Sequence, residues 1–302
     1  MRAPFDLFEP TGPETPVVVE VPHAGLYMPP PFLAQLIAPA RALGRDADLY
    51  VDGLYEDAPA EGASMIVART SRYAVDVNRA ELDADADVVE GGRADVSLHH
   101  GLVWRTTSDG EAALAARLTR AQLEERLDLV WRPYHRALAA VVERKRQRFG
   151  AVVILAAHSM PSVERSAQLG GDGRAARPRA DVVPGTRGRR SAASAFIDAV
   201  EGHAIAQGWT VRHDDPYAGG FTTQHYGRPS DGVHVVQVEL SRRLYLDEVT
   251  LRTGAGFDAV RAWCRQLVGK LGAVAASGLP AGPAASPPPA GGAATTGRRA
   301  RP

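Results

Sequence analysis

The sequence has only one cysteine and no long apolar run, and these two features exclude several classes of protein. Cys264 has no partner for an internal disulfide, and its helical surroundings, AVRAWCRQLVGKL, indicate a buried apolar side chain rather than a nucleophile. The first residues, MRAPFDLFEPTGPETP, lack the apolar core of a secretory signal, and no apolar stretch approaches the roughly 18 residues of a membrane helix. We therefore expect a cytoplasmic protein that has no membrane partner.

The chain also lacks an excess of charge of either sign. Lysine plus arginine and aspartate plus glutamate each count 35, so the formal net charge is zero. A balanced chain has no basic field that attracts a polyanion. We therefore do not expect a nucleic-acid partner.

The 302 residues are 45% hydrophobic, which is enough for a substantial core. The composition changes at about Ala275, where ASGLPAGPAASPPPAGGAATTGRRARP has almost no large apolar side chain to bury. Ordering such a segment costs conformational entropy that no burial offsets. The sequence thus predicts a single α/β domain over residues 1–274 and a disordered tail over 275–302.

Strand-like and helix-like segments alternate along the domain, which is typical of the α/β class. The runs VVVEV and AVVILAA are continuously apolar and rich in β-branched residues, as in central parallel strands that helices cover on both faces. Pro133 interrupts the longest helical pattern and predicts a break or kink there. The predicted strands are 16–21, 64–69, 73–77, 151–157, 210–213 and 233–240, and the predicted helices are 31–36, 48–56, 111–148, 192–207 and 257–271.

Polar residues of catalytic type stand at four strand ends, where ligands of such sheets bind. His23 follows VVVEV, His158 follows VILAA, Asn78 and Arg79 follow YAVDV, and Glu239 lies inside VHVVQVELS. A lone histidine at a strand end is usually structural, but two of them in one parallel sheet favour a shared site. Neutral imidazole is the commonest metal ligand, and a catalytic zinc takes three protein ligands.

A third ligand is available from the segment RDADLYVDGLYED, as Asp46, Asp48 or Asp52. Asp48 and Asp52 are one helical turn apart and share a face if the segment is helical. Helix N-capping by Asp46 or Asp48 is the alternative explanation.

Arg79 fits two interpretations. Its guanidinium either pairs with Asp76 or Glu81, or it binds the carboxylate of an amino-acid-like substrate through two parallel hydrogen bonds. Glu239 is a charge within an apolar strand, which is costly unless the charge is paired or used, for example as a base.

The remaining polar clusters predict no further site. The acidic segment ELDADADVVEGGRADVSLHH lacks the spacing of a calcium loop, so we interpret it, with His99 and His100, as a solvated loop. GGDGR and GTRG lack phosphate-loop spacing, and Ser159 lacks the GxSxG elbow of a serine hydrolase.

Taken in order, eight short blocks between about residues 16 and 250 resemble the N-formylglutamate amidohydrolases, also called N-formylglutamate deformylases. The blocks are VPHAGLYMP, DADLYVDGLY, SRYAVDVNR, GLVWRTTSDG, RPYHRAL, LAAHSMPS, DPYAGG with FTTQHYGRP, and VVQVELSRRLYLDE. The resemblance implies a fold related to zinc carboxypeptidases and aspartoacylases, with a mixed, largely parallel sheet between helices and a metal at the strand ends.

The same resemblance implies roles for individual residues. His23 and His158 match the metal-binding histidines, and Glu239 matches the general base. Those carboxypeptidases take a glutamate three residues after the first histidine, whereas Leu26 stands here. The third ligand must then come from the aspartate segment, where we favour Asp48 and keep Asp46 in reserve.

The implied reaction is hydrolysis of N-formyl-L-glutamate to formate and L-glutamate, chemistry of the histidine-degradation type. The expected cofactor is Zn²⁺, although the same ligands accept other divalent ions. Arg79 is expected to hold the substrate carboxylates, helped by Asn78 and by Arg72 or Arg243. The alternatives are an amidohydrolase acting on another N-acyl amino acid or a peptide-like substrate, and a carboxylate-binding protein that has lost catalysis.

Overall fold

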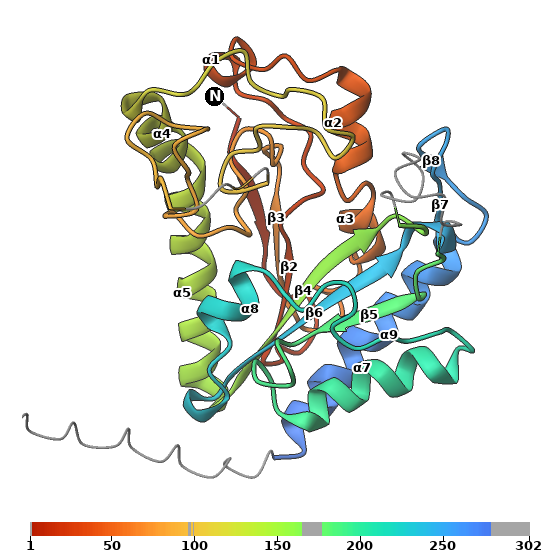
Figure 1. Ribbon diagram of the computed structural model, residues 1–302. Helices are drawn as coiled ribbons and strands as arrows, with labels where there is room; N and C mark the ends of the chain where they lie inside the picture. Colours follow the sequence, from red (N-terminus) through yellow and green to blue (C-terminus); the bar gives the residue numbers. More distant parts are fainter. Residues whose placement is uncertain (1, 96–97, 99, 165–176, 279–302) are drawn as a thin grey trace, which may run out of the picture.

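Three apolar runs form the centre of a six-stranded sheet in the computed structural model, which describes residues 2–95, 98, 100–164 and 177–278 (Figure 1). They are β2 (Val17–Val21), β4 (Val152–Met160) and β6 (Val233–Ser241), and every residue in them is buried. Strands buried on both faces require apolar side chains in both orientations, which explains the absence of alternation in these sequences.

The strand order is β1-β3-β2-β4-β6-β5. β3 (Ser64–Ala68), β2, β4 and β6 are parallel, while the two edge strands, β1 (Phe5–Phe8) and β5 (Val182–Gly185), run antiparallel to their neighbours. A separate pair, β7 (Leu246–Asp247) and β8 (Arg252–Thr253), forms a two-stranded ribbon. The expected mixed, largely parallel sheet is confirmed.

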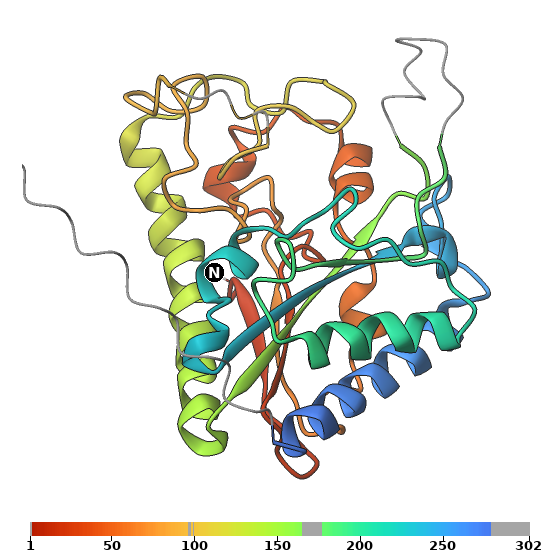
Figure 2. The ribbon, with the colours of Figure 1, turned by 60° about the horizontal axis from the view of Figure 1, so that its bottom comes forward.

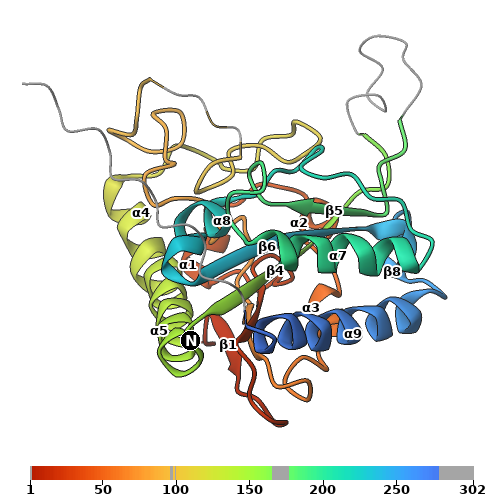
Figure 3. The same ribbon diagram turned by 90° about the horizontal axis from the view of Figure 1, so that it is seen from below.

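Helices cover both faces of the sheet, as expected (Figures 1 and 3). α5 (Arg132–Phe149) packs on the face that carries Ile154, whereas α7 (Ser194–Ala206), α9 (Phe257–Ala276) and α3 (Val51–Leu54) pack on the face that carries Leu155. The shorter helices are α1 (Pro30–Leu33), α2 (Ala40–Asp46), α4 (Arg120–Arg126), α8 (Phe221–Tyr226), the 3₁₀ turns η2 (Pro229–Asp231) and η3 (Arg242–Leu244), and the π turn η1 (Leu127–Trp131). Over the described ranges, none of the helices combines the length and apolar character needed to cross a membrane.

The long connection between β3 and α4 lies over the end of the sheet where the parallel strands terminate (Figure 2). Residues 73–77 belong to it, so the predicted strand there is wrong. Their backbone bonds instead to other loop residues, for example from the Asp76 amide to the Leu102 carbonyl. All five side chains are buried, because this loop packs onto the core, so the alternating sequence YAVDV does not mark a ladder.

One other predicted strand is wrong, and two observed strands were not predicted. Residues 210–213 make only a single bridge, Val211 to Val182. The strands β1 and β5 escaped prediction because each has only four residues, and Pro184 within β5 is typical of an edge strand, which needs fewer ladder donors.

The predicted helical segment 111–148 begins only at Arg120, after an N-cap at Thr119. Pro133 does not break it, because α4, η1 and α5 follow one another without a gap. The backbone changes to the π pattern immediately before the proline, which is the second residue of α5.

Some predictions fall on residues beyond those described. The structure does not describe His99, the segment GGDGR (170–174) or residues 279–302. α9 continues to Ala276, so the first two residues of the predicted tail are helical. Cys264 is fully buried in that helix, consistent with an apolar role.

Candidate metal centre and active site

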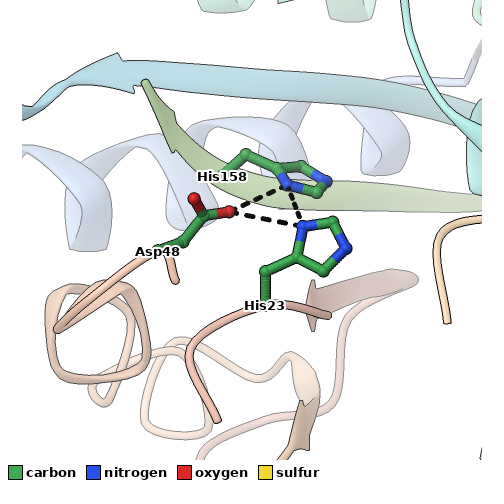
Figure 4. Close-up of side chains that lie close together, drawn as sticks. All are labelled: His23, Asp48 and His158. Atoms are coloured by element: carbon green, nitrogen blue, oxygen red, sulfur yellow. Dashed lines mark hydrogen bonds and ion pairs between the residues drawn. The ribbon is translucent and has the colours of Figure 1, made fainter. Parts of the chain in front are cut away.

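Three predicted ligands, His23, Asp48 and His158, converge at the end of the sheet (Figure 4). The Nδ1 atoms of the histidines are 3.2 Å apart, and Asp48 Oδ2 lies 3.1 Å from Nδ1 of His158 and 3.5 Å from Nδ1 of His23. Bonds of 2.0–2.1 Å in a tetrahedral shell put neighbouring ligand atoms about 3.3 Å apart. The triangle therefore has the size and the donor set of a zinc site.

The chain delivers these side chains from three separate segments. Pro22 follows β2 and His23 comes next, while His158 lies inside β4 rather than beyond its end. Asp48 lies in the turn after α2, and its amide donates to the His23 carbonyl at 3.0 Å. This backbone bond ties the aspartate segment to the first histidine.

The other two aspartates of that segment point elsewhere. Asp46 accepts hydrogen bonds from Tyr73 Oη at 2.5 Å and from the Ser108 amide at 3.1 Å, so it anchors a loop. Asp52 pairs with Arg69 at 2.6 Å. The N-capping explanation is also wrong, because the N-cap of α3 is Tyr50, and no side-chain capping bond forms.

His23 is oriented by Asp76, which the sequence did not single out for this role. His23 Nε2 lies 2.7 Å from Asp76 Oδ1, and this carboxylate also accepts from Arg72 at 2.7 Å and from Trp104 at 3.1 Å. A carboxylate behind a ligand histidine fixes the tautomer that leaves Nδ1 free for a metal. Asp76 does not pair with Arg79, as one interpretation had it.

Asp48 is held in place by Arg242. Oδ1 of Asp48, turned away from the histidines, lies 3.3 Å from Arg242 Nη2 and 3.4 Å from Ser159 Oγ. Arg242 is buried and also donates to the carbonyls of Arg45 and Ala47. The guanidinium therefore locks both the side chain and the preceding backbone.

Asn78 contacts Nε2 of His158, the ring nitrogen that does not face Asp48. Its Nδ2 lies 3.3 Å from Nε2 of His158, and its Oδ1 accepts from the Thr222 amide at 3.0 Å. In this assignment the ring proton of His158 lies on Nδ1, toward Asp48. For Nδ1 of His158 to bind a cation, that proton would have to leave Nδ1, so cation binding would be coupled to the protonation of His158.

Burial and charge set the protonation of this cluster. Burial, followed by the charge of Arg72, lowers the pKa of His23 and favours the neutral ring. Burial opposes the charged form of His158, but the bond to Asp48 and the charge of Glu239 outweigh it and raise its pKa. Burial disfavours the Asp48 carboxylate, yet hydrogen bonds from His158 and His23 hold its pKa well below the usual range.

Glu239 lies in β6 in register with His158 of β4. Gln237 donates to its Oε1 at 2.9 Å, and the side chain is buried. Burial raises the pKa of Glu239 to about 7. A carboxyl group poised near neutral pH suits proton transfer in both directions.

The candidate metal centre opens into a cavity of about 470 Å³. Its lining includes Arg72 and Arg79, which were expected to bind substrate, and also Arg45, Arg179 and Arg242. Arg243 does not belong to the lining; it pairs with Asp181 at 2.7 Å. Of this neighbouring pair, Arg242 and not the predicted Arg243 lies at the cavity.

Comparison with known proteins places the chain in a family. The family model described as N-formylglutamate amidohydrolase matches residues 15–246. The chain belongs to the N-formylglutamate amidohydrolase family. The expected resemblance is thus confirmed, and the protein is an amidohydrolase.

Individual members of the N-formylglutamate amidohydrolase family cover most of the chain. N-formylglutamate deformylase of Pseudomonas aeruginosa is 33% identical over 77% of this chain and 83% of its own length, and that of Pseudomonas putida is 31% identical over 77% and 82%. The crystal structure of N-formylglutamate amidohydrolase from Ralstonia eutropha has a TM-score of 0.83 and 31% identity, covering 92% of this chain and all of that one. A gene product of Agrobacterium tumefaciens, 18% identical with a TM-score of 0.66, shares the fold.

The stretch matched by the N-formylglutamate amidohydrolase family model contains the whole cluster described above. This stretch, residues 15–246, includes His23, Asp48, His158 and Glu239, which lie far apart in the sequence. Asp76 and Arg242 lie within it too. The sequence pointed to these two residues only through their neighbours, because Asp76 is close to Asn78 and Arg242 is next to Arg243, both of which were predicted site residues.

Proposed function

We propose that the protein hydrolyses the formyl amide of N-formyl-L-glutamate to formate and L-glutamate with the help of a divalent cation. The observation that carries the proposal is the convergence of two imidazoles and one carboxylate at 3.1–3.5 Å beside a buried glutamate of near-neutral pKa. Membership in the amidohydrolase family supports the reaction type. The names of the curated relatives support the substrate.

His23, Asp48 and His158 would hold the cation, and Zn²⁺ is our choice because two imidazole nitrogens and one carboxylate oxygen match its preferences. When bound, such an ion supplies Lewis acidity that polarises a carbonyl group and makes a water molecule more acidic. The carboxylate and guanidinium partners of the ligands keep the three donor atoms in position before any ion arrives.

Glu239 is the residue that moves protons. Its carboxylate takes a proton from the attacking water as the water oxygen bonds to the formyl carbon. The same carboxyl group then delivers the proton to the amide nitrogen as the C–N bond breaks, so that formate and the free amine leave. A pKa of about 7 lets Glu239 act first as a base and then as an acid near neutral pH.

Arg79 orients the substrate by binding a carboxylate. Its Nε and Nη1 donate to the carbonyls of His100 and Asn78 at 2.9 and 3.0 Å, which leaves Nη2 for a ligand. No carboxylate of the described residues pairs with Arg79. A fixed cation beside the metal centre holds the amide carbon in place, which is a large part of catalysis in such sites.

The test combines metal analysis with product measurement on the purified full chain. We expect about one equivalent of bound zinc and formate release from N-formyl-L-glutamate that is lost on chelation and restored by Zn²⁺. N-acetyl-L-glutamate is the matched substrate, because it differs by one methyl group. Faster release of acetate than of formate would favour the alternative N-acyl substrate. Tight binding of N-formyl-L-glutamate without turnover would favour the non-catalytic alternative.

A further inference from the structure

Arg179 lines the active-site cavity but has no assigned task. It lies in the segment that leads into β5, and its guanidinium stands 5.3 Å from the centre of the Tyr217 ring. Its Nη1 donates to Tyr217 Oη at 3.1 Å and to the Pro161 carbonyl at 3.4 Å. These contacts fix the plane of the guanidinium at the cavity wall.

The remaining edge of this guanidinium is unused. Within residues 2–95, 98, 100–164 and 177–278, Nε and Nη2 of Arg179 have no hydrogen-bond partner, and no carboxylate pairs with the group. Nε and Nη2 together form the side-on fork that binds both oxygens of one carboxylate. The other three arginines that line the cavity each pair with a carboxylate: Arg45 with Asp109, Arg72 with Asp76 and Arg242 with Asp48.

Arg79 and Arg179 are therefore the two cavity-lining arginines, among the described residues, that lack a protein carboxylate. The proposed substrate carries two carboxylates. Its α-carboxylate is separated from the amide nitrogen by a single carbon, so it must lie close to the reacting bond. Arg79 adjoins Asn78, which contacts His158, and so is placed for that group. The γ-carboxylate then remains for Arg179, which approaches from the segments that flank the ends of β4 and β5.

We propose that Arg179, oriented by Tyr217, binds the side-chain carboxylate of the substrate and so makes the enzyme select N-formyl derivatives of acidic amino acids. This inference rests on the proposed function. A neutral side chain in the same place leaves the Arg179 fork without a partner in a partly desolvated wall, which disfavours such substrates. Arg179 thus determines specificity, while Arg79 serves every N-formyl α-amino acid.

The test compares kcat/KM for N-formyl-L-glutamate and N-formyl-L-glutamine, which have nearly the same shape but differ in the side-chain charge. In Arg179→Met we expect the ratio of the two values to fall about 100-fold, the scale of losing a specific polar contact in a specificity pocket. The ratio should fall because KM for N-formyl-L-glutamate rises, while kcat/KM for N-formyl-L-glutamine should change less than about threefold. In Arg79→Met both substrates should lose similar factors, because both carry the α-carboxylate.

Two further variants serve as controls. Arg177→Met removes an exposed arginine two positions away and should keep the parent ratio. Arg179→Lys keeps the charge but loses the fork, and an intermediate ratio with an unchanged melting temperature would exclude misfolding as the cause. An unchanged ratio in folded Arg179→Met, or equal losses on both substrates, would overturn the assignment alone. If the parent protein released no formate from either compound, the proposed function would fall and the assignment with it.

Discussion

His158 and Glu239 are direct neighbours across the parallel strands β4 and β6, with their Cα atoms in register. Side chains in register on adjacent parallel strands point to the same face, so the proposed metal ligand and the proposed proton-transfer group stand side by side. Both residues lie inside their strands, where the ladder holds the backbone rigid. The pairing of β4 with β6 therefore sets the distance between His158 and Glu239.

Glu239→Gln should separate catalysis from metal binding. The amide keeps the size of the side chain but cannot take a proton, so kcat should fall by about 10²-fold or more. Metal content, measured on the same sample, should stay at the parent level, because Glu239 is not one of the three ligands. Turnover equal to that of the parent would remove Glu239 from the mechanism.

Asp48→Asn should lower metal affinity at least about tenfold, because a neutral amide is a weaker ligand than a carboxylate. Asp52→Asn is the matched control from the same segment, since Asp52 pairs with Arg69 and does not belong to the ligand group. Metal content after dialysis against a weak chelator gives the readout. Equal retention by the two variants would show that Asp48 is not a ligand.

Asp76→Asn should weaken metal binding about 10–100-fold without removing a ligand, since the carboxylate behind His23 fixes its ring. Competition with a chromophoric chelator measures the affinity. Asp57→Asn is a suitable control because Asp57 pairs with Arg261, outside the cavity lining. Trp104→Phe, which removes one donor to Asp76, should give a smaller loss. An affinity for Asp76→Asn equal to that of the control would contradict the role.

Glu20 should make the fold less stable as the pH rises. This fully buried carboxyl group bonds to Tyr134 and Thr222, and burial raises its pKa from 4.5 to about 7. Between these values the folded state keeps a proton that the unfolded chain has lost. The free energy of unfolding therefore decreases as the pH rises from about 4.5 to 7, by about 3 kcal/mol from this group.

Glu20→Gln removes that titration. Relative to the parent, the variant should gain about 3 kcal/mol in free energy of unfolding between pH 4 and pH 8. Urea denaturation of both proteins in the presence of a chelator measures the difference, and the titration of Glu239 cancels because both proteins contain it. A difference that stays constant with pH would show that the folded protein does not hold the Glu20 proton.

The sequence alone was sufficient for the central strands and for the general location of the site. VVVEV and AVVILAA are buried on both faces, so their apolar character, interrupted only by Glu20, identified β2 and β4 without tertiary information. His23, His158 and Glu239 stood out because polar side chains next to such runs are costly unless they are used. Short edge strands such as β5 gave too weak a pattern, and the alternating sequence YAVDV of a buried loop was mistaken for a strand at residues 73–77.

Tertiary contacts decided which neighbour of a selected residue takes part in the site. Asp46 and Asp48 are two positions apart and chemically identical, yet only Asp48 meets the histidines, because its amide is bonded to the His23 carbonyl. Arg242 and Arg243 likewise diverge toward Asp48 and Asp181. The physical reason is that the direction of a side chain at a turn depends on backbone bonds to segments far away in sequence. A local sequence pattern does not reveal those distant bonds. The burial of a whole strand, in contrast, can be predicted from the apolar character of its own residues.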